Sequence, residues 1–141
     1  MSKLLFVFML IPLVSLSQWD TSHVTLNNVT YKIATNKTDK GSLVLKKTSS
    51  HTVLSLENIT ISGGVKNITY VFTFMGGQTS EKTVSKVSTD KKSLILEPTF
   101  EVKKYRAYFR DCEKLEIKIQ GGESYVFDMK NAYESYNFVT K

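Results

Sequence analysis

Hydrophobic and polar residues alternate with a period of two through the first two thirds of the chain. Because successive side chains of a β-strand point to opposite faces, this alternation predicts strands with one buried face. The clearest case is formed by Ile68, Tyr70, Phe72 and Phe74. Shorter runs, separated by turn-like segments, lie at 24–26, 29–33, 43–45, 53–56, 59–61, 84–87 and 94–96. Several short strands of this kind favour an antiparallel sandwich or barrel.

The hydrophobic period changes near residue 100. Apolar residues then recur at steps of three and four, which predicts an amphipathic helix with Val102, Tyr105, Tyr108, Phe109 and Cys112 on one face. Alternation returns at 115–119 and 125–127, on either side of a Gly-Gly hairpin signal. Asp128 is the expected N-cap of a short final helix. The buried face of that helix would consist of Ala132, Tyr133, Tyr136 and Val139.

These patterns predict a mostly β chain of the α+β class. We expect an antiparallel sandwich or barrel of about seven to nine strands, with one amphipathic helix and a short C-terminal helix. The alternation changes parity at Asn27-Asn28, which indicates a bulge or a tight turn. Three Gly-Gly pairs are expected at turns that need a positive φ, and 88–92 is expected to be a further turn.

The first seventeen residues have the pattern of a secretory signal peptide. Lys3 precedes an apolar run at 4–14, and Ser15 and Ser17 occupy the −3 and −1 positions of a cleavage site. A run of eleven apolar residues is too short to span a bilayer. We therefore expect a leader at 1–17 and a single secreted or periplasmic domain at 18–141, without a membrane span. The alternative is a buried N-terminal strand or helix.

The sequence offers little material for catalysis or metal binding. The single cysteine excludes an internal disulfide framework and any multi-cysteine zinc or iron–sulfur site. No Gly-x-Ser-x-Gly, His-Glu-x-x-His, EF-hand or phosphate-loop motif occurs. We therefore expect no enzyme activity, no catalytic residue, no cofactor and no metal. Cys112 lies on the apolar stripe of the predicted helix, so a buried, inert thiol is favoured over an intermolecular disulfide.

The basic character of the chain supplies one candidate binding surface. Lys and Arg number 19 against 13 Asp and Glu, a net charge of +6. Four of the cations, Lys103, Lys104, Arg106 and Arg110, lie on the first predicted helix. The export signal argues against nucleic acid as the partner. An unknown protein, a glycan or an anionic component of the cell envelope is the expected partner, and we expect a monomer or weak homodimer.

Four Asn-x-Thr sequences occur, at Asn28, Asn36, Asn58 and Asn67. They are acceptor sites if the source is a eukaryote or its virus. A threonine-rich β segment also produces such sequences by composition alone. We favour the second interpretation, because single-cysteine secreted eukaryotic domains of this size are uncommon.

The stretch LEIKIQGGESYVFDMKNA at 115–132, with the helix before it, resembles part of the small exported bacterial β-sandwich proteins of the invasion-associated type. In those proteins a helix leads into a strand, a Gly turn, a strand ending in Phe-Asp and a closing helix. The resemblance covers about a third of the chain and implies an exported β-sandwich. The disulfide cysteines common in such proteins are absent here, and no functional residue is transferred.

We therefore expect an exported, non-enzymatic β-rich domain with a binding or structural role at the cell envelope or outside the cell. One alternative is a small secreted hydrolase-like or inhibitor-like factor, in which His23 or His51 would meet an acidic side chain. The other is a secreted eukaryotic or viral N-glycoprotein.

Overall fold

The computed structural model describes residues 19–60, 65–90, 92–97 and 100–141. In this part of the chain, seven strands come first, followed by a helix, a β-hairpin and a final helix. The elements are β1 (Trp19–Leu26), β2 (Val29–Lys37), β3 (Ser42–Lys47), β4 (Thr52–Glu57), β5 (Val65–Phe74), β6 (Thr79–Asp90), β7 (Ser93–Glu97), α1 (Val102–Asp111), β8 (Cys112–Ile119), β9 (Ser124–Asp128) and α2 (Ala132–Thr140). This order confirms the predicted mostly β fold of the α+β class.

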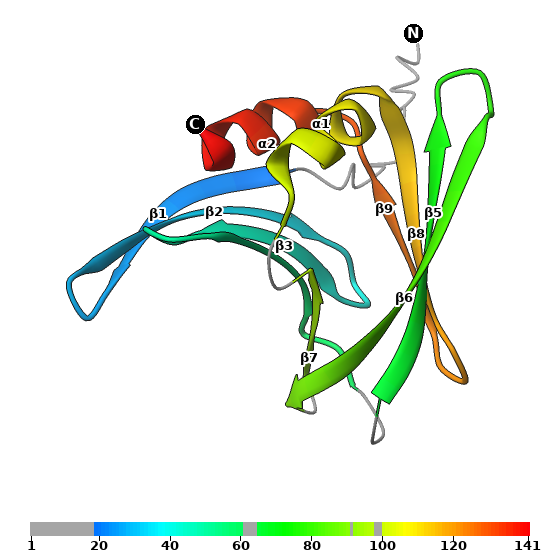
Figure 1. Ribbon diagram of the computed structural model, residues 1–141, viewed down its shortest axis with the longest axis horizontal. Helices are drawn as coiled ribbons and strands as arrows, with labels where there is room; N and C mark the ends of the chain where they lie inside the picture. The colour runs from blue at the N-terminus through cyan, green and yellow to red at the C-terminus, as the bar shows by residue number, and fades with distance from the viewer. Residues whose placement is uncertain (1–18, 61–64, 91, 98–99) are drawn as a thin grey trace, which may run out of the picture.

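The nine described strands form two antiparallel sheets that are joined through β6. Hydrogen-bonded neighbours follow the order β1-β2-β3-β4-β7-β6-β5-β8-β9. β6 is long enough to serve both sheets, because residues 79–87 pair with β5 whereas Ser88 and Asp90 pair with β7. Figure 1 shows the two sheets diverging from this strand. The described strands do not close a ring, so the fold is a two-sheet arrangement and not a closed barrel.

The β1–β2 hairpin confirms the turn predicted at Asn27-Asn28. Leu26 and Val29 pair directly, so only the two asparagines form the turn. Their φ angles are 51° and 62°, which are the positive values that a type I′ turn requires at both central positions. Leu26 and Val29 are both exposed at the tip of this hairpin, which projects away from the body of the molecule (Figure 1).

β5 supplies the central buried face of the four-stranded sheet. Ile68, Tyr70 and Phe72 are between 0% and 3% exposed, as their alternation predicts. Phe74, at the end of the same face, is only partly buried. The Phe72 ring centroid lies 4.8 Å from that of Tyr108, so the strand packs directly against α1.

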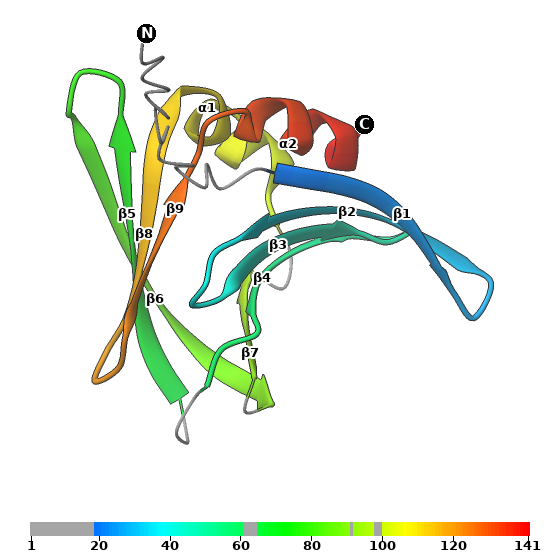
Figure 2. The ribbon, with the colours of Figure 1, turned by 180° about the vertical axis from the view of Figure 1, so that it is seen from behind.

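The two helices lie together at one end of the molecule and cover the space between the diverging sheets (Figures 1 and 2). Tyr105 and Phe109 of α1 are buried, as are Tyr136 and Val139 of α2. The rings of Phe109 and Tyr136 are 5.2 Å apart, and the Tyr136 hydroxyl donates to the Val102 carbonyl. α2 also packs on β1, β2 and β3. The amphipathic patterns of both helices are thus confirmed, although Tyr133 is only partly buried.

A buried asparagine links the two sheets. Asn36 of β2 is completely buried, and its Nδ2 donates to the Asp128 carbonyl at the end of β9 over 2.7 Å. Its Oδ1 is also buried and has no hydrogen-bond partner among the described residues. Because β2 and β9 belong to different sheets, this side chain ties the sheets together directly.

Several local predictions are wrong. Asp128 is not the N-cap of α2, because the cap position belongs to Asn131, whose φ of 63° is left-handed. The Asp128 carboxylate instead accepts from the backbone N–H of Lys130 over 2.8 Å. Residues 88–90 continue β6 and do not turn. Ile59 follows β4 as a buried loop residue, whereas residues 61–64 and 91 lie outside the described part.

Candidate functional site

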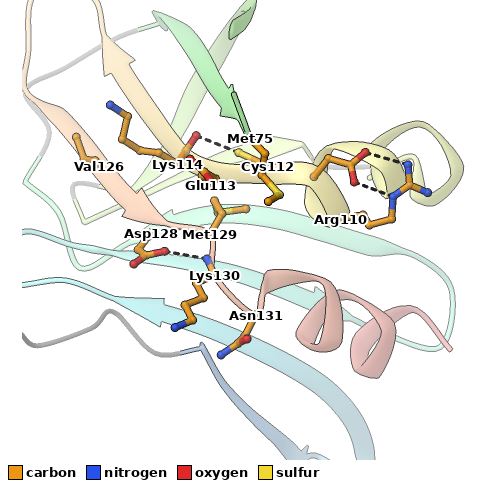
Figure 3. Close-up of a pocket in the computed structure, with 11 residues that line it drawn as sticks. Met75, Arg110, Cys112, Glu113, Lys114, Val126, Asp128, Met129, Lys130 and Asn131 are labelled. Atoms are coloured by element: carbon orange, nitrogen blue, oxygen red, sulfur yellow. Dashed lines mark hydrogen bonds and ion pairs between the residues drawn. The ribbon is translucent and has the colours of Figure 1, made fainter. Parts of the chain in front are cut away.

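A pocket of about 660 Å³ opens where α1 passes into β8. Its walls come from four places in the chain: the β5–β6 turn, the α1–β8 junction, the end of β9 and the β9–α2 loop (Figure 3). The lining residues are Met75, Arg110, Asp111, Cys112, Glu113, Lys114, Val126, Asp128, Met129, Lys130 and Asn131. This volume lies within the range of about 300–1,000 Å³ that is typical of small-molecule sites.

Backbone hydrogen bonds hold the separate walls of the pocket together. The Met75 N–H donates to the Asp111 carbonyl over 3.4 Å, and the Met129 N–H donates to the Glu113 carbonyl over 2.9 Å. These two carbonyls flank Cys112 in the sequence. The Gly76-Gly77 turn that follows Met75 has φ angles of 90° and 83°, as predicted for a Gly-Gly turn. Backbone hydrogen bonds therefore fix the positions of the pocket walls relative to one another.

The pocket has a buried apolar floor and an exposed apolar rim. Cys112 and Met129 are 5% and 2% exposed. Met75 and Val126 are 74% and 51% exposed, which makes them two of the most exposed large hydrophobic side chains in the described residues. Exposed apolar side chains beside a concave site are typical of ligand contact.

The charged residues around the pocket balance one another. Three are basic and three are acidic. Arg110 donates twice to the Asp111 carboxylate, each time over 2.9 Å. Hydrogen bonding to Arg110 is the main cause of the lowered pKa of Asp111. The rim therefore gives the pocket no strong preference for an anion or a cation.

Cys112 is buried and free, as the sequence predicts, but it is the first residue of β8 and not part of the helix. Its thiol donates to the Lys114 carbonyl over 3.0 Å. Burial raises the pKa of this thiol to about 11, because the uncharged form is favoured away from water. A thiolate nucleophile is therefore disfavoured at neutral pH.

The Cys112 thiol is expected to react slowly with a bulky thiol reagent in the folded protein, and rapidly once the protein is unfolded. At pH 8, about one thiol in a thousand would be ionised with a pKa of about 11. Replacing Cys112 with serine should cost about 1–3 kcal/mol, since a buried hydroxyl replaces the thiol. Timed labelling with and without denaturant, together with denaturation of the variant, measures both effects. Native labelling at the rate of a free thiol would contradict this account.

The four predicted basic residues of α1 are all exposed. Two of them are paired, because Lys104 lies 3.8 Å from Glu101 and Arg110 contacts Asp111. The Arg106 Nε donates to the Tyr133 hydroxyl over 3.3 Å, and this hydrogen bond is the main cause that lowers the pKa of Tyr133. Only Arg110 also lines the pocket. These four cations therefore lie on an exposed helix face whose charge is partly neutralised.

The two histidines lie on separate exposed elements. His23 of β1 packs edge-on against Phe138, with the ring centroids 5.1 Å apart. His51 lies in the β3–β4 turn, where its Nδ1 is 2.8 Å from the Ser50 Oγ. Among the described residues, neither histidine pairs with a carboxylate, and neither lines the pocket. No group of three His, Cys, Asp or Glu side chains suited to a metal ion occurs in the described part of the chain.

The four Asn-x-Thr sequences occupy different environments. Asn28, Asn58 and Asn67 are exposed, whereas Asn36 is 0% exposed and donates to the Asp128 carbonyl. A glycan on Asn36 is therefore incompatible with the folded chain. At least one of the four sequences is thus not an acceptor site in the folded chain.

The pocket was not predicted from the sequence. Its apolar floor and rim come from Met75, Cys112, Val126 and Met129, which lie far apart in the chain. Both methionines outside the predicted leader follow strand-like segments and precede turn residues, but this pattern does not mark them as neighbours of Cys112.

Comparisons of the chain with protein-family models, curated proteins and solved structures find no match. No helix among the described residues is both long enough and apolar enough to cross a membrane.

Proposed function

We propose that the protein is an exported, non-enzymatic binding domain, and that the pocket at the α1–β8 junction is its ligand site. The observation that carries this proposal is the pocket itself, with Cys112 and Met129 buried at its floor and Met75 and Val126 exposed at its rim. Export is supported by the leader-like pattern at 1–17. The protein would act at the cell envelope or outside the cell.

The chemistry of the lining supports binding more than catalysis. The histidines lie elsewhere, the Asp111 carboxylate is held by Arg110, and burial keeps the Cys112 thiol protonated. A general base or a nucleophile needs the opposite setting. The balanced rim charges favour a ligand, or a part of one, that is apolar and carries little net charge.

The full-length chain is expected to bind the uncharged fluorescent probe N-phenyl-1-naphthylamine in this pocket. Replacing Val126 with aspartate should weaken binding about tenfold, because it places a charge at the apolar rim. Val29→Asp is the matched control, since Val29 is also an exposed strand valine but lies at the β1–β2 hairpin. Fluorescence titration measures the affinities. Equal weakening by both substitutions, or no saturable binding, would contradict the proposal.

A second candidate surface is the exposed basic face of α1, which would fit an anionic envelope component. Lys103 and Arg106 form no ion pair among the described residues. We expect weak binding to vesicles containing phosphatidylglycerol that disappears at about 1 M salt, where the Debye length is about 3 Å. The double change Lys103→Glu and Arg106→Glu should abolish sedimentation with these vesicles. The same reversal at exposed Lys37 and Lys40 should not, and equal loss in both variants would argue against α1.

A further inference from the structure

Every sulfur atom outside the predicted leader belongs to a residue that lines the same pocket. The chain contains one cysteine and four methionines, and Met1 and Met9 lie within residues 1–17. The other three sulfur-containing residues, Met75, Cys112 and Met129, all line the pocket at the α1–β8 junction. They come from three separate segments, so their proximity is a product of the fold and not of sequence spacing.

The backbone brings these three residues next to one another. The Met75 N–H donates a hydrogen bond to the carbonyl of Asp111, the residue before Cys112. The Met129 N–H donates a hydrogen bond to the carbonyl of Glu113, the residue after Cys112. Cys112 therefore lies between the two methionines. Figure 3 shows the three residues among those that line the pocket, where Met75 is exposed at the rim and Cys112 and Met129 are buried.

Two of the three carboxylates that line the pocket accept hydrogen bonds, and Glu113 is the one carboxylate there that accepts none among the described residues. Both Asp111 carboxylate oxygens accept from Arg110, and the Asp128 Oδ1 accepts from the Lys130 N–H. Hard cations such as Ca²⁺ need several free oxygen ligands. Thiolate and thioether sulfur instead select soft ions such as Cu(I).

We propose that Met75, Cys112 and Met129 form a three-sulfur site for one soft monovalent metal ion, Cu(I) or Ag(I). This inference rests on the proposed role of the pocket as a ligand site. On binding, the Cys112 thiol releases its proton to solvent and forms a sulfur–metal bond. The two thioethers donate lone pairs, and the oxidation state of the metal does not change. One thiolate and one monovalent cation give a neutral centre, which suits an apolar floor where an unpaired charge is costly.

The test is a competition titration of the full-length chain. Cu(I) is supplied under anaerobic conditions on a chromophoric chelator, and Ag(I) is titrated separately as a redox-inert probe. We expect one ion per chain and no comparable retention of Zn(II) or Ca(II). Met75→Leu and Met129→Leu should each lower the affinity at least about tenfold, because a direct ligand is lost whereas side-chain volume is nearly conserved. Cys112→Ser should abolish binding, and Val29→Ala, at the exposed β1–β2 hairpin and outside the pocket, should not change it.

Three results would overturn the site. The first is unchanged affinity in both methionine variants, since any accessible thiol binds Ag(I) and the site would then be a single cysteine. The second is comparable binding of Zn(II), and the third is no binding of either soft ion. The methionine variants keep the test decisive even if Cys112→Ser does not fold.

Parallel titration with N-phenyl-1-naphthylamine separates the two proposals. Probe binding without metal binding overturns the metal site alone, whereas loss of both overturns the ligand pocket as well.

Discussion

Replacing Asn36 with aspartate is expected to destabilise the protein by about 3–5 kcal/mol at neutral pH, the range for an uncompensated buried charge. Asn36 is completely buried, and its Nδ2 donates to the Asp128 carbonyl over 2.7 Å. An aspartate would place a carboxylate oxygen against that carbonyl. Its second oxygen would take the place of Oδ1, which has no donor among the described residues.

The loss should depend on pH in a defined direction. Burial without a donor raises the pKa of the new carboxyl above its unfolded value of about 3.9. The penalty is therefore present at pH values above about 4, and it shrinks as the pH falls and the carboxyl is protonated. A protonated carboxyl can also donate to the Asp128 carbonyl, which restores the lost hydrogen bond.

Urea denaturation of the wild type and of N36D at several pH values measures this effect. The difference in unfolding free energy should be largest at neutral pH and smallest near pH 4. Asn28→Asp is the control, because Asn28 is exposed in a type I′ turn that also accepts aspartate. A pH-independent loss, or a loss under about 1 kcal/mol, would show that Asn36 does not link the sheets.

Phe72→Ala is expected to cost about 3–5 kcal/mol, the range for removing a buried phenylalanine. Phe72 is 3% exposed and lies on β5, the strand between β6 and β8. Its ring lies 6.3 Å from that of Tyr70 and 4.8 Å from that of Tyr108. The substitution therefore leaves a cavity between the four-stranded sheet and α1.

Chemical denaturation of Phe72→Ala and Phe74→Ala gives a matched comparison on one strand. Phe74 is only partly buried, so its truncation should cost less. A cost for Phe72 under about 0.5 kcal/mol, the usual range for a surface change, would remove this face of β5 from the core.

Local periodicity accounts for most of the fold that could be predicted. The alternation in β5 and the steps of three and four in α1 each depend on one buried face, so neighbouring residues carry the whole signal. The Asn27-Asn28 turn was predictable for a similar reason, because asparagine tolerates a positive φ. The N-cap of α2 was not predictable in this way. Asn131 occupies the cap position with a left-handed backbone, and the Asp128 carboxylate instead accepts from the Lys130 N–H in the preceding turn.

The candidate site could not be predicted, because it depends on contacts between distant segments. Met75 and Met129 have no local pattern that marks them as neighbours of Cys112, and only the backbone bonds to Asp111 and Glu113 bring them there. The bond from Asn36 to the Asp128 carbonyl is similarly invisible in the sequence, where Asn36 is part of an Asn-x-Thr motif. By contrast, the burial of Cys112 followed from the apolar stripe before it.

The binding role of the pocket is tested most directly by methyl NMR of the chain labelled at methionine and leucine methyl groups. The signals of Met75 and Met129 are identified with Met75→Leu and Met129→Leu, and the exposed Leu26 of the β1–β2 hairpin is the internal control. We predict that N-phenyl-1-naphthylamine shifts both methionine signals and leaves Leu26 unchanged, because both methionines line the pocket. Saturable probe binding that leaves both methionine signals in place would contradict the account.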